Sequence, residues 1–166
     1  DIDPNLNLFA HCKNLNIKND ETDAIKLVFY PSFLDETDYF LNMNYSDLIS
    51  GFDFGVFPSY YEPYGYTPLE SVTSGVPCIT SNTAGYSSII DNNDLVKDFK
   101  DAVISIDRFT KSYDENVDEL TKIMENLLNL NDYEHFLLRT NAKKLSKASD
   151  WNVLVKKYIQ IYKNLE

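Results

Sequence analysis

The segment 54–74 joins a short apolar run, a loop bounded by two glutamates and a second apolar segment. The apolar run 54–57 ends at a proline, which predicts a buried strand. Thr67 as a cap, a proline directly after it and Gly75 past the end predict a helix over 67–74. A strand that leads directly into a helix is typical of open α/β sheets, which bind nucleotides and phosphates where their strands end.

The rest of the chain alternates short apolar runs with helical patterns. Further strands are predicted at 27–30, 76–80 and 102–106. Helices are predicted at 47–50, up to about residue 90, from 114 onward, at roughly 133–147, and from Trp151 to about Leu165 with Asp150 as the cap. Polar residues 14–26 read as a loop. This alternation predicts a parallel sheet that is covered by helices on both faces.

Composition is that of an ordinary globular protein, and 166 residues suffice for about one domain with its own core. The net charge of −11 argues against binding to nucleic acid or to an anionic membrane, since both need clustered Lys and Arg. We find no membrane-spanning apolar stretch and no signal-peptide pattern, so we expect a cytoplasmic protein. Cys12 and Cys78 have no metal-ligand spacing and are expected to be reduced thiols, with Cys78 in a buried strand.

Two carboxylates, Glu62 and Glu70, bound the loop that follows the strand at 54–57. Thr67 and Glu70 have the spacing of a capping box, in which the glutamate binds the amide of the capping residue. By spacing alone, this role is at least as good as a ligand contact for Glu70. Glu62 follows a buried strand and has no helical periodicity, so a ligand-binding acid and a solvated loop acid fit its position equally well.

Three backbone amides precede Pro68, which has no N–H of its own. At a helix start these amides point outward and are open to an anion, although water can satisfy them as well. They belong to Gly65, Tyr66 and Thr67.

Four tyrosines lie within seven residues of the same loop, which is more than one short loop can bury. Aromatic residues near the edge of a sheet usually pack in the core, but at least one of these is expected to remain free to stack on a ring. A second polar loop, 81–85, follows the strand predicted at 76–80 and should lie at the same end of the sheet. Gly85 in that loop permits a positive φ or a close approach of backbone. The tyrosines are Tyr60, Tyr61, Tyr64 and Tyr66.

The thirteen residues 58–70, PSYYEPYGYTPLE, resemble the E-x7-E signature of retaining glycosyltransferases with two Rossmann-like domains. More narrowly, they are similar to SYYEPWGYTPAE of the eukaryotic-type glycogen synthases. The segments that flank this signature and also resemble the family are 30–34, 45–51, 75–82, 84–86 and 149–151. The resemblance implies an α/β fold, with a Rossmann-like parallel sheet, helices on both faces and a helical C-terminal extension. Such a chain is one half of a GT-B glycosyltransferase.

The resemblance also implies a role for each site residue. Glu62 would be catalytic and contact hydroxyls of the donor glucose near the reacting carbon. Glu70 would bind the ribose hydroxyls, and Tyr64 would lie near the base. The residues whose amides would hold the distal phosphate are Gly65, Tyr66 and Thr67. No metal and no cofactor are implied, because a helix terminus and cationic side chains provide the electrostatic stabilisation.

The implied reaction moves glucose from UDP-glucose or ADP-glucose to the 4-hydroxyl of an α-1,4-glucan with retention of configuration. The glucan would bind through an N-terminal domain that these residues do not contain. We therefore expect a nucleotide-sugar-binding domain over 1–113, a helical extension over 114–166 and no activity of the chain alone. The upstream cations of the family are also missing, since Arg108 is the first Arg. An oligomer is compatible with the sequence.

Three other functions remain open at this level. A related glucosyltransferase could use another acceptor and make sucrose, trehalose or a glycolipid. The domain could also be a non-catalytic module that binds a nucleotide sugar or a glucan. The third alternative is a scaffold with a decayed site, against which the intact spacing of Glu62 and Glu70 argues mildly.

Overall fold

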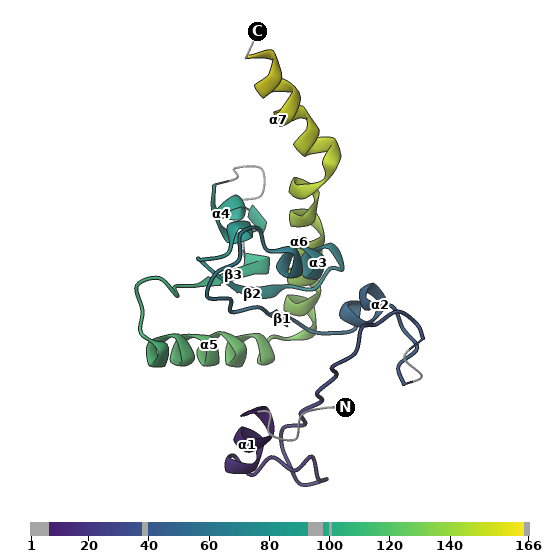
Figure 1. Ribbon diagram of the computed structural model, residues 1–166, viewed down its shortest axis with the longest axis vertical. Helices are drawn as coiled ribbons and strands as arrows, with labels where there is room; N and C mark the ends of the chain where they lie inside the picture. Colours follow the sequence, from purple (N-terminus) through teal and green to yellow (C-terminus); the bar gives the residue numbers. More distant parts are fainter. Residues whose placement is uncertain (1–6, 38–39, 93–97, 100, 165–166) are drawn as a thin grey trace. The chain divides into compact units, whose positions relative to one another are not determined.

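The computed structural model describes residues 7–37, 40–92, 98–99 and 101–164. The chain divides into two compact units, Asp1–Asn44 and Tyr45–Glu166. The described part of the first unit contains one helix, α1 (Asn7–Asn14), and an isolated antiparallel bridge between Asp35 and Asn44. The second unit contains the sheet and the remaining helices (Figure 1).

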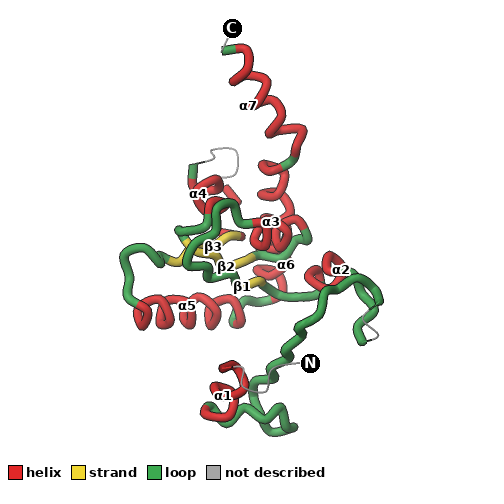
Figure 2. Tube along the Cα trace, viewed as in Figure 1, coloured by secondary structure: helices red, strands yellow, loops and turns green. Residues whose placement is uncertain are grey.

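The second unit is organised around a parallel sheet in the order β1-β2-β3 (Figure 2). The strands are β1 (Gly55–Val56), β2 (Cys78–Ser81) and β3 (Val103–Ile106). Parallel neighbours need crossover connections, and these contain α3 (Tyr66–Thr73) between β1 and β2, and α4 (Gly85–Asp91) between β2 and β3. The predicted α/β class with a parallel sheet is confirmed. Three of the four predicted strands are present, each shorter than the apolar run that indicated it.

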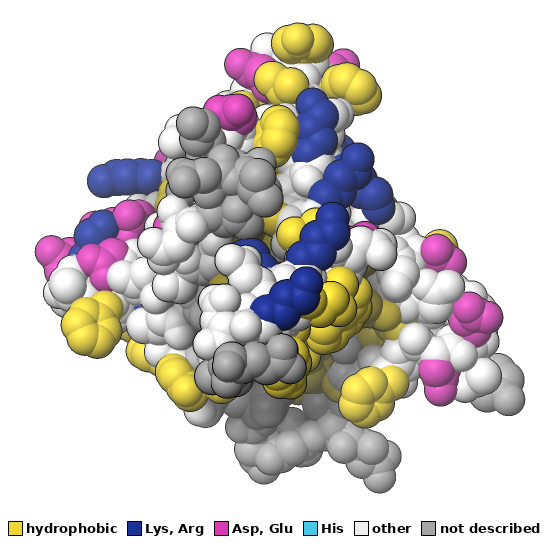
Figure 3. All heavy atoms as spheres, turned by 90° about the horizontal axis from the view of Figure 1, so that it is seen from above, with side chains coloured by type: hydrophobic (Ala, Val, Ile, Leu, Met, Phe, Trp, Pro, Cys, Tyr) yellow, Lys and Arg dark blue, Asp and Glu magenta, His cyan; other side chains and the backbone are white. Residues whose placement is uncertain are grey.

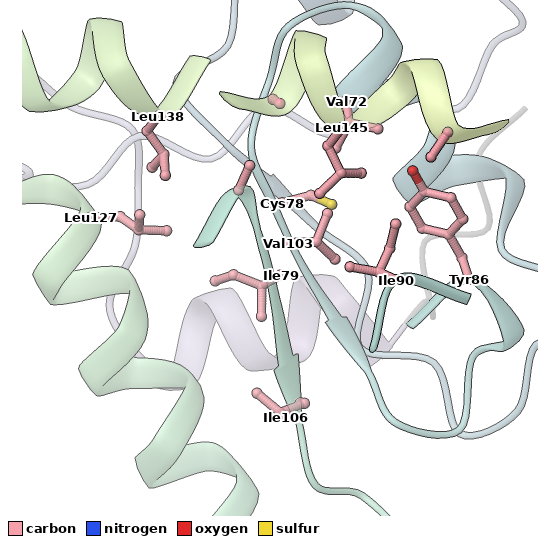
Figure 4. Close-up of a cluster of buried hydrophobic side chains, with 13 residues drawn as sticks. Val72, Cys78, Ile79, Tyr86, Ile90, Val103, Ile106, Leu127, Leu138 and Leu145 are labelled. Atoms are coloured by element: carbon pink, nitrogen blue, oxygen red, sulfur yellow. The ribbon is translucent and has the colours of Figure 1, made fainter. Parts of the chain in front are cut away.

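The core is formed by side chains from both faces of this sheet. Because successive side chains of a strand point to opposite faces, Cys78 and Ile79 of β2 enter different layers. Figure 4 shows Cys78 lying toward Val72 of α3 and Leu145, whereas Ile79 lies on the other side with Ile106. The buried cluster includes residues from α3, α4 and the C-terminal helices, so helices cover both faces as predicted.

The remaining helices follow the predicted periodicity with small shifts at their ends. They are α2 (Tyr45–Ser50), α5 (Tyr113–Leu128), α6 (Asp132–Ser146) and α7 (Trp151–Lys163), with a short 3-10 turn, η2 (Lys147–Ser149), between the last two. The predicted cap of the final helix is confirmed, because the Asp150 side chain accepts a hydrogen bond of 2.7 Å from the Asn152 amide. Two capping boxes that we did not predict begin α5 at Ser112 and α6 at Asn131.

The strand predicted at 27–30 is wrong, and α1 was not predicted. The Asn19 side chain occupies both backbone groups of Leu27: its Oδ1 accepts from the Leu27 N–H at 2.8 Å and its Nδ2 donates to the Leu27 carbonyl at 2.6 Å. A side chain therefore replaces the neighbouring strand that a ladder would require. Val28 is 79% exposed, so this apolar run does not enter a core within the described residues.

Basic and acidic side chains are unevenly distributed. Residues 139–163 contain only one acidic residue, Asp150, but many of the fifteen basic residues of the chain, namely Arg139, Lys143, Lys144, Lys147, Lys156, Lys157 and Lys163. Figure 3 shows Lys and Arg side chains in a row across the face seen from above. Cys12 and Cys78 are free thiols, as predicted, and Cys78 is buried. None of the described helices combines the length and apolar character that crossing a bilayer requires.

Candidate functional site

The loops after β1 and β2 are bound to each other at the carboxyl end of the sheet. The Ser59 carbonyl accepts hydrogen bonds from the Ser81 hydroxyl at 2.7 Å and from the Thr83 hydroxyl at 2.9 Å. Those two hydroxyls also lie 2.9 Å apart, so either of them can donate to the other in place of the Ser59 carbonyl. The prediction that the loop 81–85 lies at the same end of the sheet as the signature segment is confirmed.

Glu62 forms an isolated parallel bridge with Ala84 beyond the ends of the strands. Its amide donates to the Thr83 carbonyl at 3.3 Å, and its carbonyl accepts from the Gly85 amide at 3.0 Å. The Glu62 side chain is half-buried, and its Oε2 accepts from the Ser59 hydroxyl at 3.3 Å. The backbone of Glu62 is thus fixed on both sides, whereas its carboxylate has one long hydrogen bond. This environment is unlike that of a freely solvated loop acid.

Gly85 allows the two loops to approach closely. A Cβ atom at this position would lie 2.2 Å from the Pro63 carbonyl oxygen and 3.2 Å from the Cα atom of Tyr64. No side chain fits between backbones at that distance. Of the two roles predicted for Gly85, the close approach of backbone is confirmed.

Helix α3 begins at Tyr66, and its N-cap is Gly65 with φ +104° and no side-chain cap. The prediction of Thr67 as the cap is therefore wrong. Gly65 turns the chain in the left-handed region, which places Thr67 inside the first turn and leaves no role for its hydroxyl as a cap. The end of the helix is as predicted, because Gly75, with φ +75°, donates to the Val72 carbonyl at 3.0 Å just past the last turn.

The N-terminal amides of α3 remain open. Tyr66 and Thr67 are exposed, and in the described part of the chain neither amide has a hydrogen-bond acceptor. Pro68, at the third position of the helix, is buried and has no N–H. An α-helix leaves its first amides unsatisfied with a partial positive charge, so this end of α3 is arranged to accept an anion.

The tyrosines of the loop separate into two groups. Tyr64 is half-buried, with its ring centroid 4.9 Å from that of Tyr66 and 6.4 Å from that of Tyr86. Tyr86, at the start of α4, is fully buried, and this burial raises the pKa of its hydroxyl. The Gly65 turn packs directly against Tyr86, since a Cβ added at Gly65 would lie 2.8 Å from the Tyr86 Cβ. Tyr60, Tyr61 and Tyr66 remain exposed, as the count of tyrosines predicted.

Glu70 is exposed and makes no capping box. With Gly65 as the cap, Glu70 is five residues into the helix rather than three, so its carboxylate does not reach the cap amide. Tyr45 of α2 instead interacts with Glu70: burial of Tyr45, followed by the charge of Glu70, raises the pKa of that phenol. The capping-box role for Glu70 is therefore wrong, and the ligand role stays a prediction.

A third loop, after β3, joins the first two, and no sequence pattern predicted it. Asn82 donates to Asp107 Oδ1 at 2.6 Å and accepts from the Arg108 amide at 3.0 Å. Hydrogen bonds from Thr110, and then from Asn82, lower the pKa of Asp107 to about 2. Asn82 and Asp107 are 25 residues apart, so no local sequence pattern indicates that they pair.

Charges around the three loops are sparse. Lys111 and Glu119, 2.8 Å apart, form the one ion pair found among the described residues, and it does not include Glu62 or Glu70. The described part of the chain contains no group of three His, Cys, Asp or Glu side chains arranged to hold a metal ion.

The family model and the similar curated proteins all point to the same family. The family model described as glycogen synthase matches residues 2–165. Glycogen [starch] synthase isoform 1 of Saccharomyces cerevisiae is 35% identical over 95% of this chain and 22% of its own length. The Dictyostelium discoideum glycogen [starch] synthase is 34% identical over 95% of the chain and 18% of its own length. The human liver glycogen [starch] synthase is 31% identical over 91% of the chain and 21% of its own length.

The chain therefore spans about a fifth of the length of the curated relatives that it matches. The match includes the signature segment 58–70 and the loops that surround it in the structure. The family model covers nearly the whole chain, and the parallel sheet with its glutamate-bearing loop has the predicted form. The chain belongs to the glycogen synthase family.

Proposed function

We propose that this chain is the donor-binding part of a retaining glucosyltransferase that extends an α-1,4-glucan. The reaction breaks the bond between C1 of glucose and the distal phosphate of the donor, and a nucleoside diphosphate leaves. The 4-hydroxyl of the glucan forms the new bond to C1 and loses its proton. Retention of configuration at C1 and the use of a glucan acceptor are both part of this proposal.

The start of α3 is the observation on which the proposal mainly rests. The amides of Tyr66 and Thr67 are open, and the turn at Gly65 makes these two residues the first of the helix. In this proposal they bind the distal phosphate, and their fixed dipoles stabilise the negative charge that develops as the phosphate leaves. Such stabilisation is local, so it acts even though the net charge of the chain is −11.

Glu62 and Glu70 would act on different parts of the donor. Glu62 is held at the end of the sheet by Thr83 and Gly85, beside the loop that leads into α3, which suits a carboxylate that contacts the reacting sugar. Glu70 is exposed on α3 and would bind the ribose hydroxyls, with Tyr64 near the base. The cytoplasmic location expected from the sequence stays a prediction.

Glucose transfer by the full-length protein tests this proposal. Labelled UDP-glucose or ADP-glucose is supplied with glycogen, and incorporation into material that an α-1,4-specific glucanase digests is measured. We expect transfer from one of the two donors, and we expect Glu62→Gln to lower kcat by about 10²–10³-fold. Glu125→Gln, an exposed glutamate on α5, is the matched control and should retain full activity. Transfer only to a small sugar or a lipid would point to a related glycosyltransferase instead.

Calorimetric titration separates donor binding from catalysis. The full-length protein is titrated with UDP, ADP and their glucose conjugates, with and without Glu70→Ala. We expect saturable binding of one nucleotide and a clear loss of affinity in Glu70→Ala. Because α3 has no capping box at Glu70, this variant should lose only the small stability that the contact between Glu70 and Tyr45 provides. Nucleotide binding without any glucose transfer would favour a non-catalytic module.

A further inference from the structure

Arg108 is placed at the candidate site by a rigid turn at the end of β3. The Asp107 carboxylate accepts hydrogen bonds from the Phe109 amide at 3.1 Å, the Thr110 amide at 3.2 Å and the Thr110 hydroxyl. Asn82 from the neighbouring loop binds Asp107 and the Arg108 amide at once. The backbone of Arg108 is therefore fixed relative to the loop after β2.

The Arg108 guanidinium lies over the ring of Tyr60, with Cζ 3.7 Å from the ring centroid. This distance is well inside the range of a cation–π contact. Arg108 is half-buried, and its Nε is buried without a hydrogen-bond partner in the described part of the chain. The stacking on Tyr60 is thus the main contact that determines where this cation sits.

Tyr60 connects Arg108 to Glu62, because Tyr60 and Glu62 lie in the same short turn, 59–62. Tyr60 directly follows Ser59, whose carbonyl binds the loop after β2, and only Tyr61 separates it from Glu62. The Ser59 hydroxyl also donates to the Glu62 carboxylate. Tyr60 and Tyr61 are 74% and 77% exposed, but among the described residues only Tyr60 has a cation over its ring. The turn 59–62 is therefore held by backbone bonds at its two ends and by Arg108 at the ring of Tyr60.

We propose that Arg108 is a positioning residue for Glu62. By stacking on Tyr60, Arg108 holds the turn 59–62 and the Glu62 carboxylate in the geometry that the reaction needs. This inference rests on the proposed function, since it assigns Arg108 to the same site. Arg108 acts here through Tyr60 and not through contact with the donor. Removal of Arg108, of Tyr60 or of both should therefore have a similar effect on the reaction.

Kinetics of the full-length enzyme test this unit. Arg108→Ala and Tyr60→Ala should each lower kcat about threefold to tenfold, as expected for the loss of a partly desolvated cation–π contact. The double variant should be no slower than the slower single variant, and the KM for the donor should stay within about twofold throughout. Arg108→Lys and Tyr60→Phe should each retain more activity than the corresponding alanine variant. Phe109→Ala, which removes an exposed neighbouring ring, is the matched control.

Hydrogen exchange of the same full-length variants gives a readout that does not depend on activity. The amides of residues 60–62 should exchange faster in Arg108→Ala and Tyr60→Ala than in wild type or Phe109→Ala. If the wild type transfers no glucose, the proposed function fails, and the exchange result still decides whether Arg108 holds the turn. Unchanged exchange, additive effects on kcat, or a donor KM that rises only in Arg108→Ala would each overturn the proposal.

Discussion

Two glycines shape the candidate site for different physical reasons. Gly65 has φ +104°, and an added Cβ would also lie 2.8 Å from the Cβ of Tyr86. Gly85 is constrained by packing instead, since an added Cβ would lie 2.2 Å from the Pro63 carbonyl oxygen. The first position needs a left-handed backbone and the second needs space. Both positions adjoin the backbone that carries Glu62, so either substitution reaches the site through its scaffold.

Gly85→Ala should lower the free energy of unfolding by about 1–3 kcal/mol, because the two loops must separate to admit a methyl group. Urea unfolding of the chain measures this change. Gly51→Ala is the matched control, since its Cβ would lie 3.4 Å from the Leu48 carbonyl oxygen and is tolerated. Equal unfolding midpoints for the two variants would show that the close approach at Gly85 is not required.

The Asp107 carboxyl should titrate well below an ordinary aspartate. Its pKa is lowered to about 2 by Thr110 and Asn82, whereas an unfolded aspartate has a pKa of about 3.9. The unfolded chain therefore binds this proton first as the pH falls. The stabilisation by Asp107 is complete above about pH 4 and is lost as the pH approaches about 2. An NMR titration of the carboxyl carbon should give a midpoint near 2, and a midpoint near 4 would contradict the hydrogen bonding described.

At the scale of elements, α6 binds the C-terminal ends of two other helices. Arg139 donates to the Ser50 carbonyl at 2.8 Å and to the Phe52 carbonyl at 2.7 Å, where α2 ends. Lys143 donates to the Thr73 carbonyl at the end of α3. Helix C-termini present unsatisfied carbonyls with partial negative charge, so both cations are well placed. Through α2, which contacts Glu70 by way of Tyr45, this clamp extends to the candidate site.

Arg139→Ala should lower the free energy of unfolding by about 1–3 kcal/mol, because two charge-assisted hydrogen bonds are lost and two carbonyls are left without them. Arg139→Lys should recover only part of the loss, since an ammonium lacks the planar fork that reaches both carbonyls. Urea unfolding again provides the measurement. Lys122→Ala, an exposed lysine of α5, serves as the control and should change stability little. A similarly small effect of Arg139→Ala would rule out the clamp.

At the scale of the whole molecule, the buried core lies within one of the two compact units. Every member of the main hydrophobic cluster falls in Tyr45–Glu166, from Val72 to Ala148. Helices α2 and α3, whose C-terminal carbonyls bind side chains of α6, belong to the same unit as α6. The second unit therefore contains the sheet, the clamp and the candidate site together.

A chain of residues 45–166 should fold cooperatively and unfold at nearly the same urea concentration as the 166-residue chain. A chain that begins at Gly55 is the informative comparison, because it also removes buried Ile49 and the carbonyls that Arg139 binds. We expect this shorter chain to be clearly less stable. Circular dichroism in urea distinguishes the two. Loss of cooperative unfolding on removal of residues 1–44 would show that the core needs them.

Predictions from the sequence succeeded where hydrogen bonds are local and the apolar pattern is regular. The 3.6-residue spacing located α5, α6 and α7, and Asp150 was a correct cap because it binds an amide two residues away. The prediction at 27–30 failed because a strand depends on a partner, and Asn19 took that place for Leu27. Thr67 failed as a cap because the left-handed turn at Gly65 starts the helix earlier.

The sequence by itself determined the family, the strand–loop–helix unit and the two glutamates at its ends. Only the tertiary structure decided how that unit is held. Ser59 with Ser81, Asn82 with Asp107, and Arg139 with Phe52 are separated by 22, 25 and 87 residues. Contacts of this kind form when the sheet and its helices bring distant loops together, and no local pattern encodes them. The same packing places Arg108 on Tyr60, next to the acid that the signature had already identified.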